Sequence, residues 1–214
     1  MAAAPRTDLS IARHRSSILK ETTLLTKTHQ PHLSQTTARY EARHLDENGA
    51  DISYSVDGIG PALVLGDGTA LNAHTNWAEL VEPLSQVRTV IRPNYSGSGA
   101  TTDSGGELTV ERLATQVVST AKAANALPFD LVGFSLGAAV AVHIAAHHPE
   151  KVRSLVLIGG LLASEDPRMQ LQLRLWQALC VDDTAALAKI MVLTGFSQSF
   201  LASLNETALE GMID

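Results

Sequence analysis

Short apolar runs alternate along the chain with longer segments whose apolar positions recur every three or four residues. The short runs predict buried strands, and most of them end near glycine or proline, as at Gly66-Asp67-Gly68 and Gly159-Gly160. The predicted strands span residues 62–65, 89–91, 131–134 and 155–158, and the predicted helices span residues 77–84, 109–126 and 136–148. This alternation is typical of the α/β class with a doubly wound, mostly parallel sheet, which binds its ligand at the carboxyl ends of the strands.

Turn and cap residues mark the ends of several elements. Two further strands are predicted over residues 39–45 and 52–56, joined across Asn48-Gly49, which is a strong hairpin-turn signal. Thr109 is the expected N-cap of the long helix that follows it, and Pro149 ends the next helix. The folded core is therefore expected to begin at residue 39.

The alternation stops after Leu161. Residues 170–180, 183–193 and 198–209 all have a helical pattern, and the apolar stretch 190–193 continues an alanine-rich helix. We therefore expect residues 161–214 to form a helical lid over the strand ends.

Residues 1–38 differ from the rest, because basic residues outnumber acidic ones and serine and threonine are frequent. That composition overlaps with organelle transit peptides, and a flexible tail or a start codon assigned too early would produce it as well. The expected organisation is a flexible N-terminal extension over 1–38, a core over 39–160 and the helical segment after it.

Composition and charge exclude several classes of partner. The net charge of −6 argues against binding to nucleic acid, and no apolar run is long enough to span a bilayer. Cys180 is the one cysteine, so no internal disulfide can form, as in proteins of a reducing compartment. A cytoplasmic protein is the expectation, with organelle targeting by residues 1–38 as the alternative.

The sharpest motif is Gly133-Phe134-Ser135-Leu136-Gly137, which matches the G-x-S-x-G nucleophile elbow. A predicted strand precedes it and a predicted helix rich in small residues follows it, as the tight strand-to-helix turn requires. Ser135 is therefore the candidate nucleophile, and Gly133 and Gly137 are the elbow glycines. A serine that merely caps the helix is the simpler alternative, and the two roles are compatible.

With this motif in place, the chain resembles the α/β-hydrolase superfamily from residue 39 to its C-terminus. The resemblance implies two backbone N–H donors for an oxyanion, at Thr69 and at Leu136. The family usually has His-Gly before the first donor, where this chain has Asp67-Gly68. The segment 92–99 resembles the family's Asp-x-Arg-Gly-x-Gly loop, with Asn94 and Ser96 in place of its Asp and Arg.

The resemblance also implies an acid and a histidine that follow the nucleophile in the chain. The last histidine is His148, and it belongs with His143 and His147 to the helix after Ser135. Eight or more residues at 1.5 Å each place them roughly 12 Å or more from the nucleophile. We therefore expect a C-terminally incomplete hydrolase fold, whose open sheet edge allows self-association or partner binding.

Three functions stay open at this point. The first is a serine hydrolase of the esterase, thioesterase or lactonase type, acting on a small acyl substrate through an acyl-enzyme, and incomplete or weakly active as this chain alone. The second is a non-catalytic binding protein, suggested by the missing base and by Asp67, Asn94 and Ser96. The third is a split enzyme whose acid and base come from another chain. No metal or organic cofactor is implied, because no ligand spacing or phosphate loop is present.

Overall fold

The computed structural model describes residues 42–160 and 166–213. The predicted extension over 1–38 and the first residues of the predicted strand 39–45 lie outside this range.

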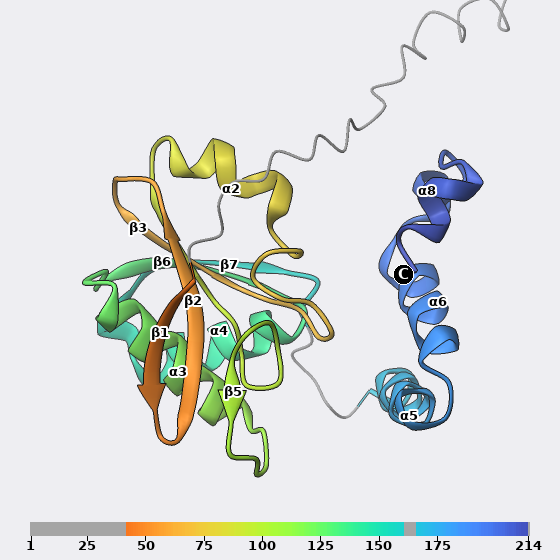
Figure 1. The fold of residues 1–214 in the computed structure, drawn as a ribbon, viewed down its shortest axis with the longest axis horizontal. Coiled ribbons are helices and arrows are strands. Elements are labelled where there is room, and N and C mark those ends of the chain that lie inside the picture. The colour runs from red at the N-terminus through yellow and green to blue at the C-terminus, as the bar shows by residue number, and fades with distance from the viewer. Residues whose placement is uncertain (1–41, 161–165, 214) are drawn as a thin grey trace, which may run out of the picture. The chain divides into compact units, whose positions relative to one another are not determined.

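Residues 42–160 form an α/β body around one mixed sheet (Figure 1). Its strands are β1 (Arg43–Glu47), β2 (Ala50–Asp57), β3 (Ala62–Gly66), β4 (Thr89–Pro93), β5 (Thr102–Asp103), β6 (Phe129–Phe134) and β7 (Val152–Ile158). The strand order is β1-β2-β4-β3-β6-β7, with β5 beside β2. Pairing is parallel among β4, β3, β6 and β7 and antiparallel wherever β2 takes part. The predicted α/β class is confirmed.

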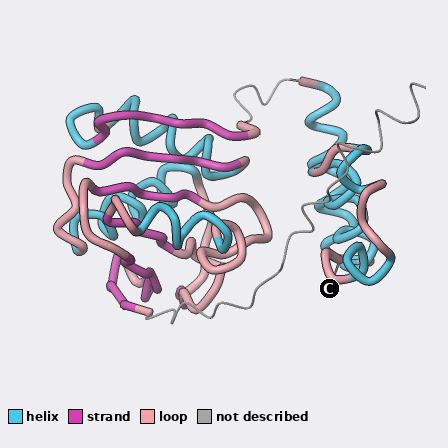
Figure 2. The backbone as a smooth tube through the Cα atoms, turned by 90° about the horizontal axis from the view of Figure 1, so that it is seen from above, coloured by secondary structure: helices cyan, strands magenta, loops and turns pink. Residues whose placement is uncertain are grey.

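Helices cover both faces of the sheet, as expected of a doubly wound fold. They are α2 (Ala78–Ser85), α3 (Val110–Ala123) and α4 (Leu136–His147), and Figure 1 shows α2 on one side of the strands and α3 and α4 on the other. Side chains of β3 alternate accordingly, since Val64 packs with α3 and α4, whereas Leu63 and Leu65 pack with Trp77 and Val81. The tube view shows the strands side by side (Figure 2).

Local signals placed most of these elements correctly. The hairpin turn between β1 and β2 has positive φ at Asn48 and Gly49, as its sequence predicted. Thr109 caps α3, because its side chain accepts a hydrogen bond from the N–H of Arg112 at 3.1 Å. The helix ends at Ala123, earlier than predicted, because Asn125 has a φ of 54° that no α-helix tolerates.

Residues 166–213 are helical, as predicted. The helices are α5 (Pro167–Asp182), α6 (Thr184–Gly195), α7 (Gln198–Leu201) and α8 (Glu206–Glu210). The single helix predicted over 198–209 is two short helices, because Asn205 has an extended backbone and caps α8. The role of this segment as a lid stays a prediction. Among the helices of the described residues, none is long and apolar enough to cross a membrane.

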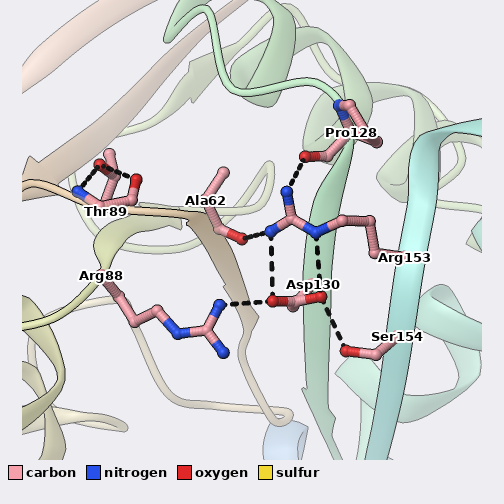
Figure 3. Close-up of polar contacts among 8 residues, drawn as sticks. Ala62, Arg88, Thr89, Pro128, Asp130, Arg153 and Ser154 are labelled. Atoms are coloured by element: carbon pink, nitrogen blue, oxygen red, sulfur yellow. Dashed lines mark hydrogen bonds and ion pairs between the residues drawn. The ribbon is translucent and has the colours of Figure 1, made fainter.

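An ion cluster around Asp130 joins the strands at the end of the sheet opposite the elbow (Figure 3). Asp130 of β6 accepts hydrogen bonds from Arg88, Arg153 and Ser154. Arg153 of β7 also donates to the carbonyl oxygens of Ala62 and Pro128, at 2.8 and 2.9 Å. The bond from Arg153, followed by those from Ser154 and Arg88, lowers the pKa of Asp130 to about 2. This cluster therefore ties β3, β6 and β7 together.

We expect Asp130→Asn to destabilise the chain by about 1–2 kcal/mol at pH 7, allowing for screening at the partly exposed arginines. Because the pKa is lowered on folding, the contribution of Asp130 is complete above pH ~4 and is lost as the pH falls towards 2. Urea unfolding at pH 7 and pH 3 measures both values. The exposed Asp46→Asn is the control, and an equal loss at both pH values would contradict the cluster's electrostatic role.

Candidate active site

Ser135 lies on the turn between β6 and α4, in a conformation that L-residues avoid. Its φ is 52° and its ψ is −111°. Such backbone strain amounts to roughly 1–3 kcal/mol and is concentrated at functional sites. The Ser135 N–H donates to the carbonyl oxygen of Ile158 at 2.9 Å, which fixes the turn against β7. Ser135 is the N-cap residue of α4, but its side chain makes no capping hydrogen bond to that helix.

The two elbow glycines allow α4 to lie directly against the sheet. A Cβ added to Gly133 would lie 2.2 Å from the carbonyl oxygen of Gly137. A Cβ on Gly137 would lie 2.3 Å from the carbonyl oxygen of Gly66, at the end of β3. Both neighbours are backbone atoms, so neither position can accept a side chain without movement of a strand or helix. The sequence motif thus has a steric cause.

The loop after β3 runs beside the start of α4. The carbonyl oxygen of Asp67 accepts a hydrogen bond from the N–H of Gly137 at 2.9 Å. The next residue, Gly68, donates its N–H to Oδ1 of Asn76 at 2.9 Å. Neither Thr69 nor Leu136 donates its N–H to a partner within the described residues. Both predicted oxyanion donors are therefore available at the same end of the sheet.

Asp67 is buried beneath this loop, where the family usually has histidine. Its side chain is inaccessible to solvent, and Oδ1 accepts a hydrogen bond from Nε1 of Trp77 at 2.7 Å. Oδ2 has no partner within the described residues. Burial raises the pKa of Asp67 to about 7, against the lowering effects of the Trp77 bond and the Arg92 charge. The sequence marked this residue only as a departure from the family's usual His-Gly.

Asn94 and Ser96, which stand where the family has a charge pair, are held by hydrogen bonds to uncharged groups and to the carboxyl group of Asp103. Asn94 is buried, donates through Nδ2 to Oγ of Ser53 at 2.8 Å, and accepts from the N–H of Ala73 at 2.9 Å. Ser96 donates its N–H to Oε1 of Gln116 at 3.1 Å, and the Gln116 amide returns a bond to its hydroxyl. These contacts join β2, the loop after β3 and α3. The two departures from the family pattern are thus compatible with an ordered loop.

A pocket of about 370 Å³ opens beside the elbow. It is lined by residues 68–72 and 95–99 together with Leu108, Val110, Leu113 and Leu136. No aspartate, glutamate, lysine, arginine or histidine is among these residues. The pocket lining therefore carries no charged side chain and includes several leucine and valine residues.

None of the histidines of the described core is among the residues that line this pocket, although His74 donates its N–H to Oδ1 of the lining residue Asn72 at 2.9 Å. His143 and His147 stack on each other on α4, with ring centroids 4.1 Å apart. Nδ1 of His148 lies 3.0 Å from Nζ of Lys151, in the turn before β7. His44 pairs with Asp51 across the β1–β2 hairpin. Within residues 42–160 and 166–213, no group of three histidine, cysteine, aspartate or glutamate side chains is placed to hold a metal ion.

Comparison with known proteins gives one consistent family. The sequence profile described as "alpha/beta hydrolase fold" matches residues 61–198. A pyrrolizixenacetamide deacetylase from Xenorhabdus hominickii is 47% identical over 165 residues, which is 77% of this chain and 62% of that protein. A 2-hydroxy-6-oxo-2,4-heptadienoate hydrolase from Pseudomonas putida is 35% identical over 100 residues, 46% of this chain and 36% of that protein.

Solved structures agree on the fold. A hydrolase from Pseudomonas aeruginosa has a TM-score of 0.68 and 25% identity, covering 81% of this chain and 65% of that one. The enol-lactonase from Burkholderia xenovorans has a TM-score of 0.70 and 21% identity, covering 80% of this chain and 66% of that one. The chain spans less than two thirds of the length of each of these proteins. The absence of the strands that carry the acid and the histidine stays a prediction. The expected resemblance is confirmed, and the chain belongs to the α/β-hydrolase family.

Proposed function

We propose that this chain carries the nucleophile and the oxyanion donors of a serine hydrolase that forms an acyl-enzyme at Ser135. The strained elbow carries this proposal. It holds Ser135 partly exposed directly before Leu136, and the N–H groups of Leu136 and Thr69 have no partner in the described structure. In the reaction, Oγ of Ser135 attacks a carbonyl carbon, the alcohol, thiol or amine leaves, and water then releases the acid. Each oxyanion donor is worth about 3–4 kcal/mol in such a barrier.

The pocket supports a small or medium, uncharged acyl group as the substrate's acid part. Its lining has no ionic side chain that would stabilise a carboxylate or an ammonium group. Its lining includes the apolar residues Leu108, Val110 and Leu113 together with Leu136, the second proposed oxyanion donor. The deacetylase of Xenorhabdus hominickii, whose name describes removal of an acetyl group, agrees with a short acyl group. Ester, thioester and amide bonds are all within this proposal.

The residues that line the pocket include no histidine that could act as the general base. The three histidines after Ser135 lie on α4 or directly after it, roughly 12 Å or more along the helix. A second copy of the chain is one source of a base. The edge strand β7 offers a docking surface for it, because Val156 and Ile158 are 50% and 42% exposed.

Fluorophosphonate labelling of the purified chain tests this function. We expect covalent labelling that is lost in Ser135→Ala and retained in Ser199→Ala, an exposed serine on α7. A base supplied by a second copy would make the labelling rate per chain rise with protein concentration. Absence of labelling in a folded protein would contradict the proposal.

The alternative is a binding protein that keeps the hydrolase scaffold without turnover. The departures from the family pattern at Asp67, Asn94 and Ser96 favour it. It predicts that Ser135→Ala binds a neutral acyl compound in the pocket as tightly as the unchanged chain, which calorimetry measures. Labelling at Ser135 distinguishes the two functions, because a pure binding protein has no use for an activated serine.

A further inference from the structure

Asp67 connects three parts of the fold, namely β3, the start of α4 and the residue before α2. Its backbone follows directly from β3, and its carbonyl oxygen accepts the N–H of Gly137 at the start of α4. Its carboxyl group accepts the indole N–H of Trp77, immediately before α2. None of the mechanism described above uses this carboxyl group.

We propose, on the basis of the proposed function, that Asp67 is a positioning residue that fixes the oxyanion loop by joining the Trp77 indole to the elbow. Its carboxyl group acts through Trp77, and its carbonyl oxygen acts through Gly137. Together they set the path of the chain into Gly68 and Thr69. The N–H of Thr69 is thereby placed for the oxyanion that Ser135 chemistry creates.

Trp77 is a rigid anchor for this contact. Its side chain is buried and packs with Leu63, Leu65, Val81 and Val90 on the α2 face of the sheet. The adjacent Asn76 holds the N–H of Gly68 through its side chain at 2.9 Å. Two successive loop residues are therefore tied to the turn before α2. Thr69, which comes next, is exposed, so the position of its N–H depends on the hydrogen bonds that Asp67 and Gly68 make with Trp77 and Asn76.

Asp67 is not itself a group that touches substrate. Its side chain is fully buried, and it is absent from the lining of the pocket, which begins at Gly68. Trp77 is likewise absent from that lining. Any effect of the carboxyl group on the reaction must therefore pass through the loop.

The charge state of the Asp67 carboxyl group changes the strength of its hydrogen bond with the Trp77 indole. An ionised carboxylate accepts a hydrogen bond roughly twice as strong as a neutral group does. Burial raises the pKa of Asp67 to about 7, so the group loses its proton in the neutral range and holds the indole more strongly above it. The titratable groups that act on it are Arg92 of β4 and Tyr95 of the following loop. Burial raises the pKa of Tyr95, so its hydroxyl does not titrate in that range.

Nuclear magnetic resonance of the ¹⁵N-labelled chain between pH 5 and 9 tests the proposal. The indole N–H of Trp77 and the backbone N–H of Thr69 are both expected to shift with one midpoint near 7. Trp176→Phe assigns the indole signal, because the chain has two tryptophans. Asp67→Asn should abolish both shifts, whereas the control Asp130→Asn should leave them unchanged.

Trp77→Phe serves as the second variant, in case Asp67→Asn does not fold. The Trp77 bond lowers the pKa of Asp67, so its loss is expected to move the Thr69 midpoint upward. A flat Thr69 signal in the unchanged chain, a titration that persists in Asp67→Asn, or an unchanged midpoint in Trp77→Phe would each overturn the proposal.

These signals do not require an activated serine, so they separate this inference from the proposed function. If the chain shows the titration but is not labelled, the positioning role of Asp67 is supported and the proposed enzymatic function is contradicted. In a chain that takes the label, Asp67→Asn is expected to slow labelling roughly tenfold and to flatten its pH profile near 7. A tenfold decrease is smaller than the 10²–10³-fold decrease that follows complete removal of an oxyanion donor, because the Thr69 N–H is less well placed but still present. An unchanged rate and profile would overturn the positioning role.

Discussion

Gly137→Ala is expected to destabilise the chain by roughly 3 kcal/mol or more, a large fraction of the stability of a typical domain. The added Cβ would lie 2.3 Å from the carbonyl oxygen and 2.5 Å from the carbonyl carbon of Gly66, and 2.8 Å from the carbonyl oxygen of Asp67. These are backbone atoms, which cannot rotate away as a side chain can. Either α4 moves off the sheet or β3 bends, and both disrupt the packing between them.

Equilibrium unfolding in urea measures this effect. Gly195→Ala is the matched control, because nothing lies within 4 Å of a Cβ added there, at the end of α6. The control should leave the stability unchanged or raise it by up to about 1 kcal/mol. Gly133→Ala should behave like Gly137→Ala, since its Cβ would lie 2.2 Å from the Gly137 carbonyl oxygen. Stability of Gly137→Ala equal to that of the control would show that α4 does not lie this close to β3.

The elbow could be predicted because its cause is local. A short apolar strand, a serine between two glycines and a helix of small residues all lie within about twenty positions. A Cβ added to Gly133 would lie 2.2 Å from the carbonyl oxygen of Gly137, which explains why the motif requires glycine at its first position. The capped start of α3 at Thr109 was predictable for the same reason.

Other parts of the site depend on contacts between distant segments, and local pattern does not reveal them. Asn94 and Ser96 stand out in the sequence only as departures from a family loop. Their neutral partners, Ser53 and Gln116, lie 41 and 20 positions away and become visible only once β2 and α3 are packed. The two-residue strand β5 went unpredicted, because its pairing with β2 is set by the loop that positions it.

The pKa of Asp67 is the clearest example of such a long-range property. The sequence shows an aspartate between two glycines, which is typical of a solvated turn. In the fold, the same residue lies under the oxyanion loop with its carboxyl group inaccessible to solvent. Burial, which no local pattern encodes, therefore decides its protonation at neutral pH.

Asp67→Asn is accordingly expected to stabilise the chain at pH 8.5 by about 1–3 kcal/mol, although it removes a buried hydrogen-bonding carboxylate. The folded state binds the proton of Asp67 more tightly than the unfolded state, whose pKa is near 3.8. The stability of the unchanged chain therefore falls as the pH rises from about 4 to about 7 and stays lower above that. Asparagine carries no charge at any pH and still offers an oxygen to the Trp77 indole.

Urea unfolding at pH 4 and pH 8.5 tests this prediction, since the advantage of Asp67→Asn should be small at the lower pH and full at the higher one. Asp130→Asn provides the opposite case, because the pKa of Asp130 is lowered on folding and its replacement destabilises the chain at high pH. A loss of stability in Asp67→Asn at pH 8.5 would show that the Trp77 hydrogen bond and the Arg92 charge stabilise the ionised carboxylate by more than burial destabilises it. Asp67 would then be ionised throughout the neutral range, and the tie to Trp77 would be equally strong on both sides of pH 7.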